Sequence, residues 1–279
     1  NLKEEEKEFI LPIMKEYYDG YKFSLDSEKH IYNSNMCLYL LSYYSSIGKL
    51  PNSLIDPNIA SDYKKLAGMF NLYKGEERRK IIEKSVLNEG ILSNIVDSFT
   101  VKEDFNVTDF ISNLFYLGYL TIKDLEVGTP ILAVPNEVMK RLYTDYFLSL
   151  TVDEIGGSSI SYPVLKSDLA LNGNVDKISK TLENLLERLS NRDYQSFDEK
   201  YVKVLFYSLV QNFDDTYIVK SEYEVERKYP DLLLTPLNKN KGYYSVMIEF
   251  KYLKKTDENK LNETIERAKS QLREYSEKQ

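Results

Sequence analysis

The sequence predicts an α+β fold, with a mainly helical N-terminal domain followed by an α/β core. Apolar residues recur at helical spacing through most of the first 150 residues. Farther along, three strand-like runs follow one another between residues 217 and 253, preceded by two helical patterns and followed by a third. Because no helix separates these strands, a doubly wound nucleotide-binding fold is excluded.

The N-terminal elements follow from apolar periodicity and from turn residues. A first helix is predicted over residues 9–17 and ends near Asp19-Gly20. A second helix is predicted over residues 36–44, before the loop signals at Gly48 and Pro51. Further helices are predicted over residues 61–73, 76–88, 106–118 and 136–150, and short strands over residues 119–122 and 130–134.

Residues 151–173 are predicted to link two domains. The stretch contains Gly156-Gly157, Ser158-Ser159 and Pro163, and its apolar patterning is weak. We therefore expect a helical domain at residues 1–150 and a second domain at residues 174–279. An internal loop within one continuous helical domain is an equally compatible reading of the same stretch.

The C-terminal domain is patterned more strongly. Residues 175–189 place apolar side chains on one helical face with charged side chains opposite, and residues 202–213 predict a second helix. Strands are predicted over residues 217–226, 231–235 and 243–253, and a last helix over residues 261–275. The predicted order of the core is therefore helix, three strands, helix, with one more helix in front.

Composition and charge exclude several classes of function. The 279 residues carry 37 Lys and Arg against 44 Asp and Glu, a formal net charge of -7, so any nucleic-acid surface must be local. The single cysteine, Cys37, excludes an intrachain disulfide and a multi-Cys zinc site. The single histidine, His30, excludes a His-rich metal site, and no serine or cysteine nucleophile motif accompanies it.

Three kinds of segment are missing from the sequence. It has no GxxxxGK[ST] motif, so no nucleotide-binding residues are predicted. It also has no apolar run long enough to span a membrane and no signal-peptide pattern. We therefore expect a cytoplasmic protein that does not act at a membrane.

The sharpest chemical pattern combines Pro230-Asp231 with Glu249-Phe250-Lys251. Residues two apart on a strand project from the same face, so Glu249 and Lys251 should point together while Phe250 enters the core. If the two strands pair as a hairpin across residues 236–242, Asp231 approaches Glu249. The pattern then brings two carboxylates and one ammonium together.

That combination suits phosphate chemistry. Two adjacent carboxylates repel one another unless a proton or a divalent cation joins them, and hard oxygen ligands suit Mg²⁺ or Mn²⁺. A neighbouring ammonium can stabilise charge on an attacked phosphate. A solvated strand face with alternating charges is the ordinary alternative. Here, Val246-Met247-Ile248 and Phe250 predict a central, buried strand, where unpaired charges would be costly.

Short motifs are spread along almost the whole chain. The first half contains Tyr18-Asp19-Gly20-Tyr21-Lys22-Phe23, Tyr32-Asn33, Leu117-Gly118-Tyr119-Leu120-Thr121 and Pro135-Asn136-Glu137-Val138. The second half contains Val219-Lys220-Ser221-Glu222, Asp231-Leu232-Leu233-Leu234 and Ile248-Glu249-Phe250-Lys251-Tyr252-Leu253. In these motifs the chain resembles a bacterial family that joins an AAA-ATPase-like region to a C-terminal PD-(D/E)XK nuclease superfamily domain.

The resemblance implies a restriction-endonuclease-like core and roles for five residues. Asp231 and Glu249 would bind a metal ion, Mg²⁺ or Mn²⁺, and Lys251 would be the catalytic lysine. Glu224 matches the family's upstream acidic residue, and Gln271 matches a residue on the following helix that points back to the site. The whole set expected in catalysis is thus Glu224, Asp231, Glu249, Lys251 and Gln271.

The implied function is metal-dependent phosphodiester hydrolysis of nucleic acid, with DNA favoured over RNA, by a nuclease that forms part of a larger AAA-ATPase-like protein. Residues 1–150 would correspond to the lid-like, C-terminal region of its AAA-ATPase-like part. The alternative, from another class, is a non-catalytic regulatory or protein-binding module that retains the nuclease fold. The acidic net charge favours this alternative, whereas the intact Asp231, Glu249 and Lys251 favour the nuclease.

The chain departs from the family pattern at several places. Lys228-Tyr229-Pro230 replaces a Gly-Arg pair before the aspartate, and Ser34 replaces the proline that follows Tyr32-Asn33. The Walker A segment is absent, so we expect no ATP binding by these residues. A strand commonly follows the helix that bears the glutamine. The sequence ends at Gln279, so we expect this last strand to be missing.

Overall fold

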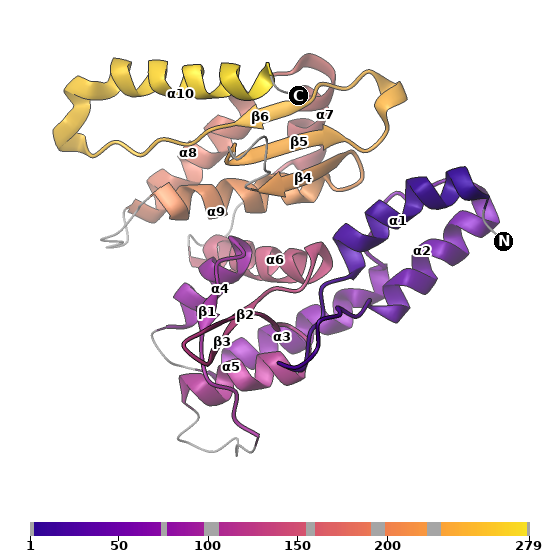
Figure 1. Ribbon diagram of the computed structural model, residues 1–279. Coiled ribbons are helices and arrows are strands. Elements are labelled where there is room, and N and C mark those ends of the chain that lie inside the picture. Colours follow the sequence, from indigo (N-terminus) through magenta and orange to yellow (C-terminus); the bar gives the residue numbers. More distant parts are fainter. Residues whose placement is uncertain are drawn as a thin grey trace. The chain divides into compact units, whose positions relative to one another are not determined.

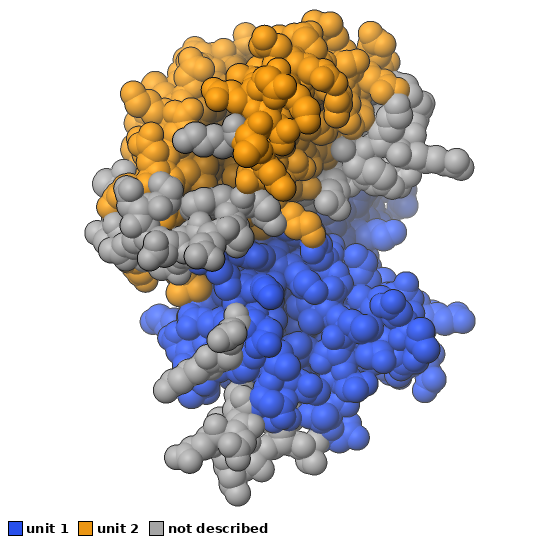
Figure 2. Space-filling view, turned by 90° about the vertical axis from the view of Figure 1, so that its left-hand side faces the viewer, with its two compact units in different colours: residues 1–147 blue, residues 148–279 orange. Residues whose placement is uncertain are grey.

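The computed structural model describes residues 3–73, 77–97, 106–154, 160–190, 199–221 and 230–277. The chain divides into two compact units, Asn1–Phe147 and Leu148–Gln279, coloured blue and orange in Figure 2. Helices predominate, and the described residues of each unit include a three-stranded antiparallel sheet. The predicted α+β class is confirmed. None of the helices in the described ranges is both long and apolar enough to cross a membrane.

Unit 1 contains most of the helices predicted for the first half. They are α1 (Glu4–Tyr18), α2 (Ser34–Ile47), α3 (Ala60–Leu72), α4 (Arg78–Val86), α5 (Val107–Tyr116) and α6 (Glu137–Glu154), which continues into unit 2. The sheet contains β1 (Ile91–Leu92), β2 (Thr121–Glu126) and β3 (Thr129–Ala133), with β3 in the middle. The sequence analysis missed β1, because two residues are too short to show an alternating pattern.

The core of unit 1 is aromatic and centres on Phe70 of α3. Its ring lies edge-on to Phe110 of α5, with 4.9 Å between centroids, and stacks on Tyr146 of α6 at 5.2 Å. Tyr143 of α6 also lies edge-on to Phe70, and both side chains are fully buried. Aromatic rings bury a large area and add favourable edge-to-face contacts, so this cluster joins three helices.

Two of the first-half motifs meet where α1 ends and α6 begins. Gly20 has a φ of 104°, and a Cβ atom at that position would lie 2.0 Å from the carbonyl oxygen of Pro135. Next to it, the side-chain amide of Asn136 donates a hydrogen bond of 2.9 Å to the carbonyl of Asp19. Only glycine fits this approach of two backbone segments.

The other two first-half motifs contact the same segment. The N–H of Asn33 donates to the carbonyl of Tyr18 at 2.7 Å, and the N–H of Lys22 donates to Oγ1 of Thr121 at 2.6 Å. The Tyr18 side chain is fully buried and donates its hydroxyl to the carbonyl of Leu54 at 2.7 Å. All four motifs therefore contact one another at one junction. These contacts account for the residue types in the motifs.

The described residues of unit 2 form helices and a sheet. Its elements are α7 (Tyr162–Asn172), α8 (Asp176–Ser190), α9 (Glu199–Val210), the short helix η2 (Gln211–Phe213), β4 (Tyr217–Ser221), β5 (Leu232–Pro236), β6 (Val246–Ile248) and α10 (Leu261–Ser276). The strand order is β4-β5-β6, and both pairings are antiparallel. Figure 1 shows α10 on one side of this sheet and α9 on the other.

The structure differs from the expected linker at residues 151–173. Helix α7 occupies residues 162–172 within that stretch, and α6 extends to Glu154. Pro163 lies in the first turn of α7, where its missing N–H is not needed, and Gly173 ends the helix with a φ of 63°. Pro163, one of the residues that indicated a linker, therefore marks the start of a helix. Both glycines at 156 and 157 lie outside the described residues.

The third strand is shorter than predicted and has a different place in the sheet. β6 spans only three residues, and β5 is the central strand of the described sheet, so the expectation of a central strand around residues 246–250 was wrong. The ladder stops there because the N–H of Phe250 donates to a side-chain carboxylate, Oδ2 of Asp231, instead of to a neighbouring strand. The predicted strand at 217–226 is present up to Ser221, and residues 222–229 lie outside the described part.

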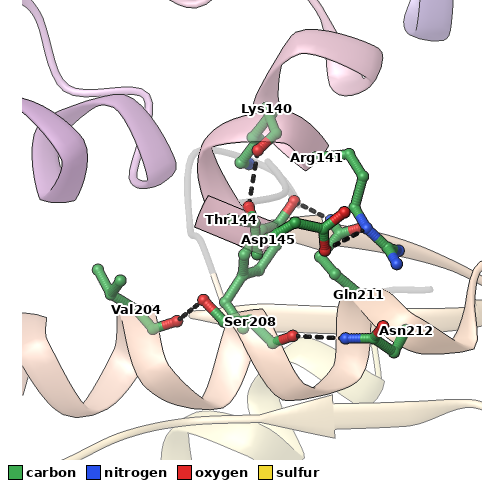
Figure 3. A network of polar contacts seen from close by, with 9 residues as sticks. Lys140, Arg141, Thr144, Asp145, Val204, Ser208, Gln211 and Asn212 are labelled. Carbon is green, nitrogen blue, oxygen red and sulfur yellow. Dashed lines mark hydrogen bonds and ion pairs between the residues drawn. The ribbon is translucent and has the colours of Figure 1, made fainter. Parts of the chain in front are cut away.

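Helix α9 forms the core of unit 2, and every residue from Lys203 to Val210 is buried. A buried hydroxyl inside it is satisfied locally, because Ser208 donates to the carbonyl of Val204 at 2.7 Å. Asn212 then donates its side-chain amide to the carbonyl of Ser208 at 3.1 Å, as Figure 3 shows. One charged residue, Lys203, is buried in this helix and leads to the candidate site.

Candidate active site

Asp231 is brought to the Glu249-Phe250-Lys251 segment by the pairing of β5 with β6. Leu232 pairs with Ile248, and this antiparallel register, continued by one residue, sets Asp231 opposite Glu249. The N–H of Phe250 donates to Oδ2 of Asp231 at 2.7 Å. The aspartate therefore lies against the backbone of the segment that carries the other carboxylate and the lysine.

Glu249 and Lys251 point toward one another. The ammonium of Lys251 lies 2.5 Å from Oε1 of Glu249, and their side chains are 27% and 5% exposed, respectively. The intervening Phe250 packs its ring against Phe206 of α9 at 5.3 Å between centroids. This is the arrangement that the two-residue spacing predicts, although the segment follows β6 instead of lying within it.

Two buried side-chain oxygens, from residues that the resemblance assigns to the site, have no hydrogen-bond donor in the described part of the chain. They are Oε2 of Glu249 and Oε1 of Gln271, which is on α10. Buried acceptors are normally satisfied, so each such atom calls for an explanation. Glu224, the remaining residue that the resemblance assigns to the site, lies outside the described residues.

Sequence reasoning missed Lys203, which contacts the site directly. Its ammonium lies 3.1 Å from Oδ1 of Asp231, and the two side chains are 10% and 18% exposed. A buried lysine requires a partner, and Lys203 stands alone as a cation within the apolar run of residues 202–210. That isolated cation on the buried face of a helix was the signal available in the sequence.

Glu199, the first residue of α9, also reaches the segment after β6. Its Oε2 accepts a hydrogen bond of 3.0 Å from the N–H of Tyr252. Together with the Phe206–Phe250 contact, this bond attaches the first half of α9 to residues 250–252. The helix thus holds the candidate catalytic segment from one side.

The donor set can be tested against a divalent cation. In the described ranges, no group of three or more His, Cys, Asp and Glu side chains is arranged to hold a metal ion. The oxygens that the structure brings together are the carboxylates of Asp231 and Glu249, on paired segments. Carboxylate oxygens are ligands that Mg²⁺ and Mn²⁺ prefer, and Oε2 of Glu249 is buried without a hydrogen-bond donor from the described residues. The residues present therefore fit such an ion.

A pocket of about 320 Å³ lies between α7 and α8, and its described lining includes Lys177, Lys180 and Arg188 but none of the candidate site residues. Beside it, Asp168 accepts a hydrogen bond of 2.9 Å from Asn172 and lies 3.3 Å from the ammonium of Lys177. These two partners hold the pKa of the Asp168 carboxyl below its usual range. They stabilise the turn between α7 and α8.

Comparison with known proteins gives one match. Residues 197–279 match the family model described as the PD-(D/E)XK nuclease superfamily. No curated protein and no solved structure matches the chain significantly. The matched range begins just before α9 and includes Asp231, Glu249, Lys251 and Gln271 as well as Lys203. A PD-(D/E)XK nuclease superfamily domain is therefore found at residues 197–279.

Proposed function

We propose that this protein hydrolyses phosphodiester bonds in nucleic acid in a reaction that requires a divalent metal ion. The main support is the arrangement of Asp231, Glu249 and Lys251 within the matched superfamily domain. The buried, unsatisfied Oε2 of Glu249 gives the site a place for a cation. PD-(D/E)XK nucleases generally use divalent ions, typically Mg²⁺, and act on nucleic acid.

Asp231 and Glu249 would hold the ion, either Mg²⁺ or Mn²⁺. When bound, the ion supplies positive charge for the phosphate and lowers the pKa of a water molecule. The N–H of Phe250 holds Oδ2 of Asp231 in place, so the carboxylate does not need to be ordered when the ion arrives. The low exposure of Glu249 keeps bulk water away from the second ligand.

Lys251 and Gln271 would act on the phosphate and on the water. The Lys251 ammonium is partly exposed, so it can turn from Glu249 toward a bound phosphate and offset the charge that develops there. The neutral amide of Gln271 can orient a water molecule or complete the ion's ligands through Oε1. Glu224 would add an upstream carboxylate. DNA is the favoured substrate over RNA.

We also propose that this nuclease domain works within a larger AAA-ATPase-like protein. The matched domain starts at residue 197, so this proposal rests on the motifs of unit 1 alone. Those motifs form a packed junction around Gly20 and Pro135 and carry no phosphate-binding loop.

The experiment is a cleavage assay on the whole chain with labelled single- and double-stranded DNA and RNA. Each substrate is incubated with Mg²⁺, Mn²⁺ or a chelator, and Glu249→Gln serves as the site variant. We expect ion-dependent cleavage by the unmodified protein and none by Glu249→Gln. Glu263→Gln is a matched control, because that glutamate is exposed on α10 and forms its ion pair with Arg267 on the same helix. Equal cleavage by both variants would contradict the proposal.

A specific observation favours the alternative of a non-catalytic binding module. Each of the two candidate ligands already forms an ion pair with a lysine, Asp231 with Lys203 and Glu249 with Lys251. Because lysines of the protein neutralise both carboxylates, such a site keeps its fold without a metal ion. Retention of a nucleic-acid or protein ligand together with the absence of cleavage under all the ion conditions above would select this alternative.

A further inference from the structure

Lys203 gives the candidate site a second ammonium that the sequence analysis did not anticipate. It projects from α9, is 8% exposed, and contacts Oδ1 of Asp231 at 3.1 Å. The other oxygen of the same carboxylate accepts the N–H of Phe250 at 2.7 Å. Both oxygens of Asp231 therefore have a donor from the protein. One of the two donors, the Lys203 ammonium, carries a full positive charge.

The second carboxylate is compensated in the same way. Lys251 lies 2.5 Å from Oε1 of Glu249, while Oε2 of Glu249 has no donor. These four side chains sum to a formal charge of zero. A divalent ion that binds to the two carboxylates must therefore enter beside two ammonium groups, and at short range in a poorly hydrated site this repulsion is strong.

The two lysines differ in their freedom to move away. Lys251 is 27% exposed and lies on a segment without strand pairing, whereas the side chain of Lys203 is 10% exposed and is fixed on a helix in the core. Lys251 can turn toward solvent or toward a phosphate. Lys203 stays beside Asp231, so its charge acts on any cation that shares that carboxylate.

We propose that Lys203 is a positioning residue that holds the Asp231 carboxylate in place without metal and lowers the affinity of the site for the ion. This inference rests on the proposed metal-dependent function. Lys203 acts through Asp231 and is not assigned any contact with substrate. Its charge compensates Asp231 before the ion binds and limits how tightly the ion is held afterwards.

The test is the binding of Mn²⁺ to the whole chain, measured by calorimetry and by the rise in melting temperature on adding the ion. Lys203→Met removes the charge and keeps the length of the side chain. We expect its Kd for Mn²⁺ to fall by about tenfold or more, because one close positive charge has been removed. Without metal, the variant should melt at a lower temperature than the unmodified protein, since the half-buried Asp231 is left without its counter-charge.

Three further variants separate this role from a purely structural one. Lys203→Arg keeps the charge and should bind Mn²⁺ as the unmodified protein does. Lys166→Met breaks another Lys–Asp pair of unit 2, with Asp215 at 2.5 Å, and should leave the Kd unchanged. If Lys203→Met fails to fold without metal, Lys203→Gln supplies the same measurement with a neutral donor that can still reach Asp231.

The outcomes distinguish a failure of the role assigned to Lys203 from a failure of the proposed metal-dependent function. If the unmodified protein binds Mn²⁺ and the neutral Lys203 variants bind it no more tightly, the role assigned to Lys203 is wrong while the metal-dependent function stands. If neither the unmodified protein nor any neutral Lys203 variant binds Mn²⁺ or Mg²⁺, both are wrong. Tighter binding confined to the neutral Lys203 variants supports the inference.

Discussion

The backbone N–H of Phe250 donates a 2.7 Å hydrogen bond to Oδ2 of Asp231, nineteen residues earlier in the chain. Because Phe250 lies between Glu249 and Lys251, this one bond fixes the aspartate against the segment that carries the other two candidate catalytic groups. It also ends the β5–β6 ladder, since the N–H is no longer available to a strand. The site therefore forms where regular pairing stops.

Asp231→Asn tests the first metal ligand. Asparagine keeps an oxygen that can accept the Phe250 N–H, but it lacks the charge that holds a divalent ion in water. We expect cleavage to be lost and Mn²⁺ binding to weaken by at least about tenfold, measured by calorimetry. Asp215→Asn is the matched control, because Asp215 pairs with Lys166 away from the site. Full cleavage by Asp231→Asn would remove Asp231 from the mechanism.

Lys251→Ala should separate catalysis from ion binding. The ammonium offsets charge on the phosphate in the proposed reaction, so its removal should lower the single-turnover rate by ~10²-fold or more. Binding of Mn²⁺ should remain nearly unchanged, because Lys251 is not a proposed ligand and can turn away from Glu249. Lys254→Ala, at an exposed position three residues later, should leave the rate unchanged. Loss of Mn²⁺ binding in Lys251→Ala would show that its role is to support the ligand.

Gln271→Ala should have a smaller effect than Lys251→Ala. A neutral amide orients a water molecule or an ion but adds no charge, so we expect a loss of roughly tenfold in the cleavage rate. The comparison is with Ser270→Ala, an exposed neighbour on α10. A decrease larger than that of Lys251→Ala, measured under identical conditions, would assign Gln271 a direct place among the metal ligands.

Gly20→Ala tests the junction of the unit 1 motifs. The added Cβ would lie 2.0 Å from the carbonyl oxygen of Pro135, so the two backbone segments must separate. We expect a destabilisation of about 2 kcal/mol or more in chemical unfolding. Gly128→Ala is the control, because Gly128 also has a positive φ, of 81°, but its Cβ would meet nothing within 4 Å. Equal losses would attribute the effect to backbone strain alone.

Asp168→Asn should make stability less dependent on acid pH. The Asn172 hydrogen bond and the Lys177 ammonium lower the pKa of Asp168 in the folded protein. A lowered pKa stabilises the fold at pH values above the usual range of an aspartate, and this contribution is lost as the pH falls through the folded value. The melting temperatures of variant and unmodified protein should therefore differ at neutral pH and converge in acid. A difference that stays constant with pH would contradict this account.

Much of the fold could be predicted because the long elements are periodic. Helices α8 and α10 have apolar side chains three or four residues apart, and the Asp231 and Glu249–Lys251 pattern pointed to the correct pair of strands. Strands β5 and β6 are consecutive in the chain and pair with one another, so their contact could be predicted from strand order. Such features need no knowledge of distant contacts.

The remaining features depend on contacts that a sequence does not display. The segment that forms α7 was expected to belong to a linker, partly because Pro163 can signal either a loop or the first turn of a helix. The length of β6 depends on a side chain from residue 231 taking the N–H of residue 250. Lys203 joined the site only through tertiary packing, since it lies 28 residues before its partner.

The close approach of Gly20 to Pro135 has a consequence for how relatives of this protein can diverge. A residue other than glycine at position 20 is compatible with the fold only if the backbone at position 135 moves, and that movement would disturb the hydrogen bond from Asn136 to Asp19. Substitutions at these positions are therefore expected to occur together in evolution. The segments around residues 20 and 135 are more than a hundred residues apart in the chain. They should nevertheless covary in an alignment of relatives.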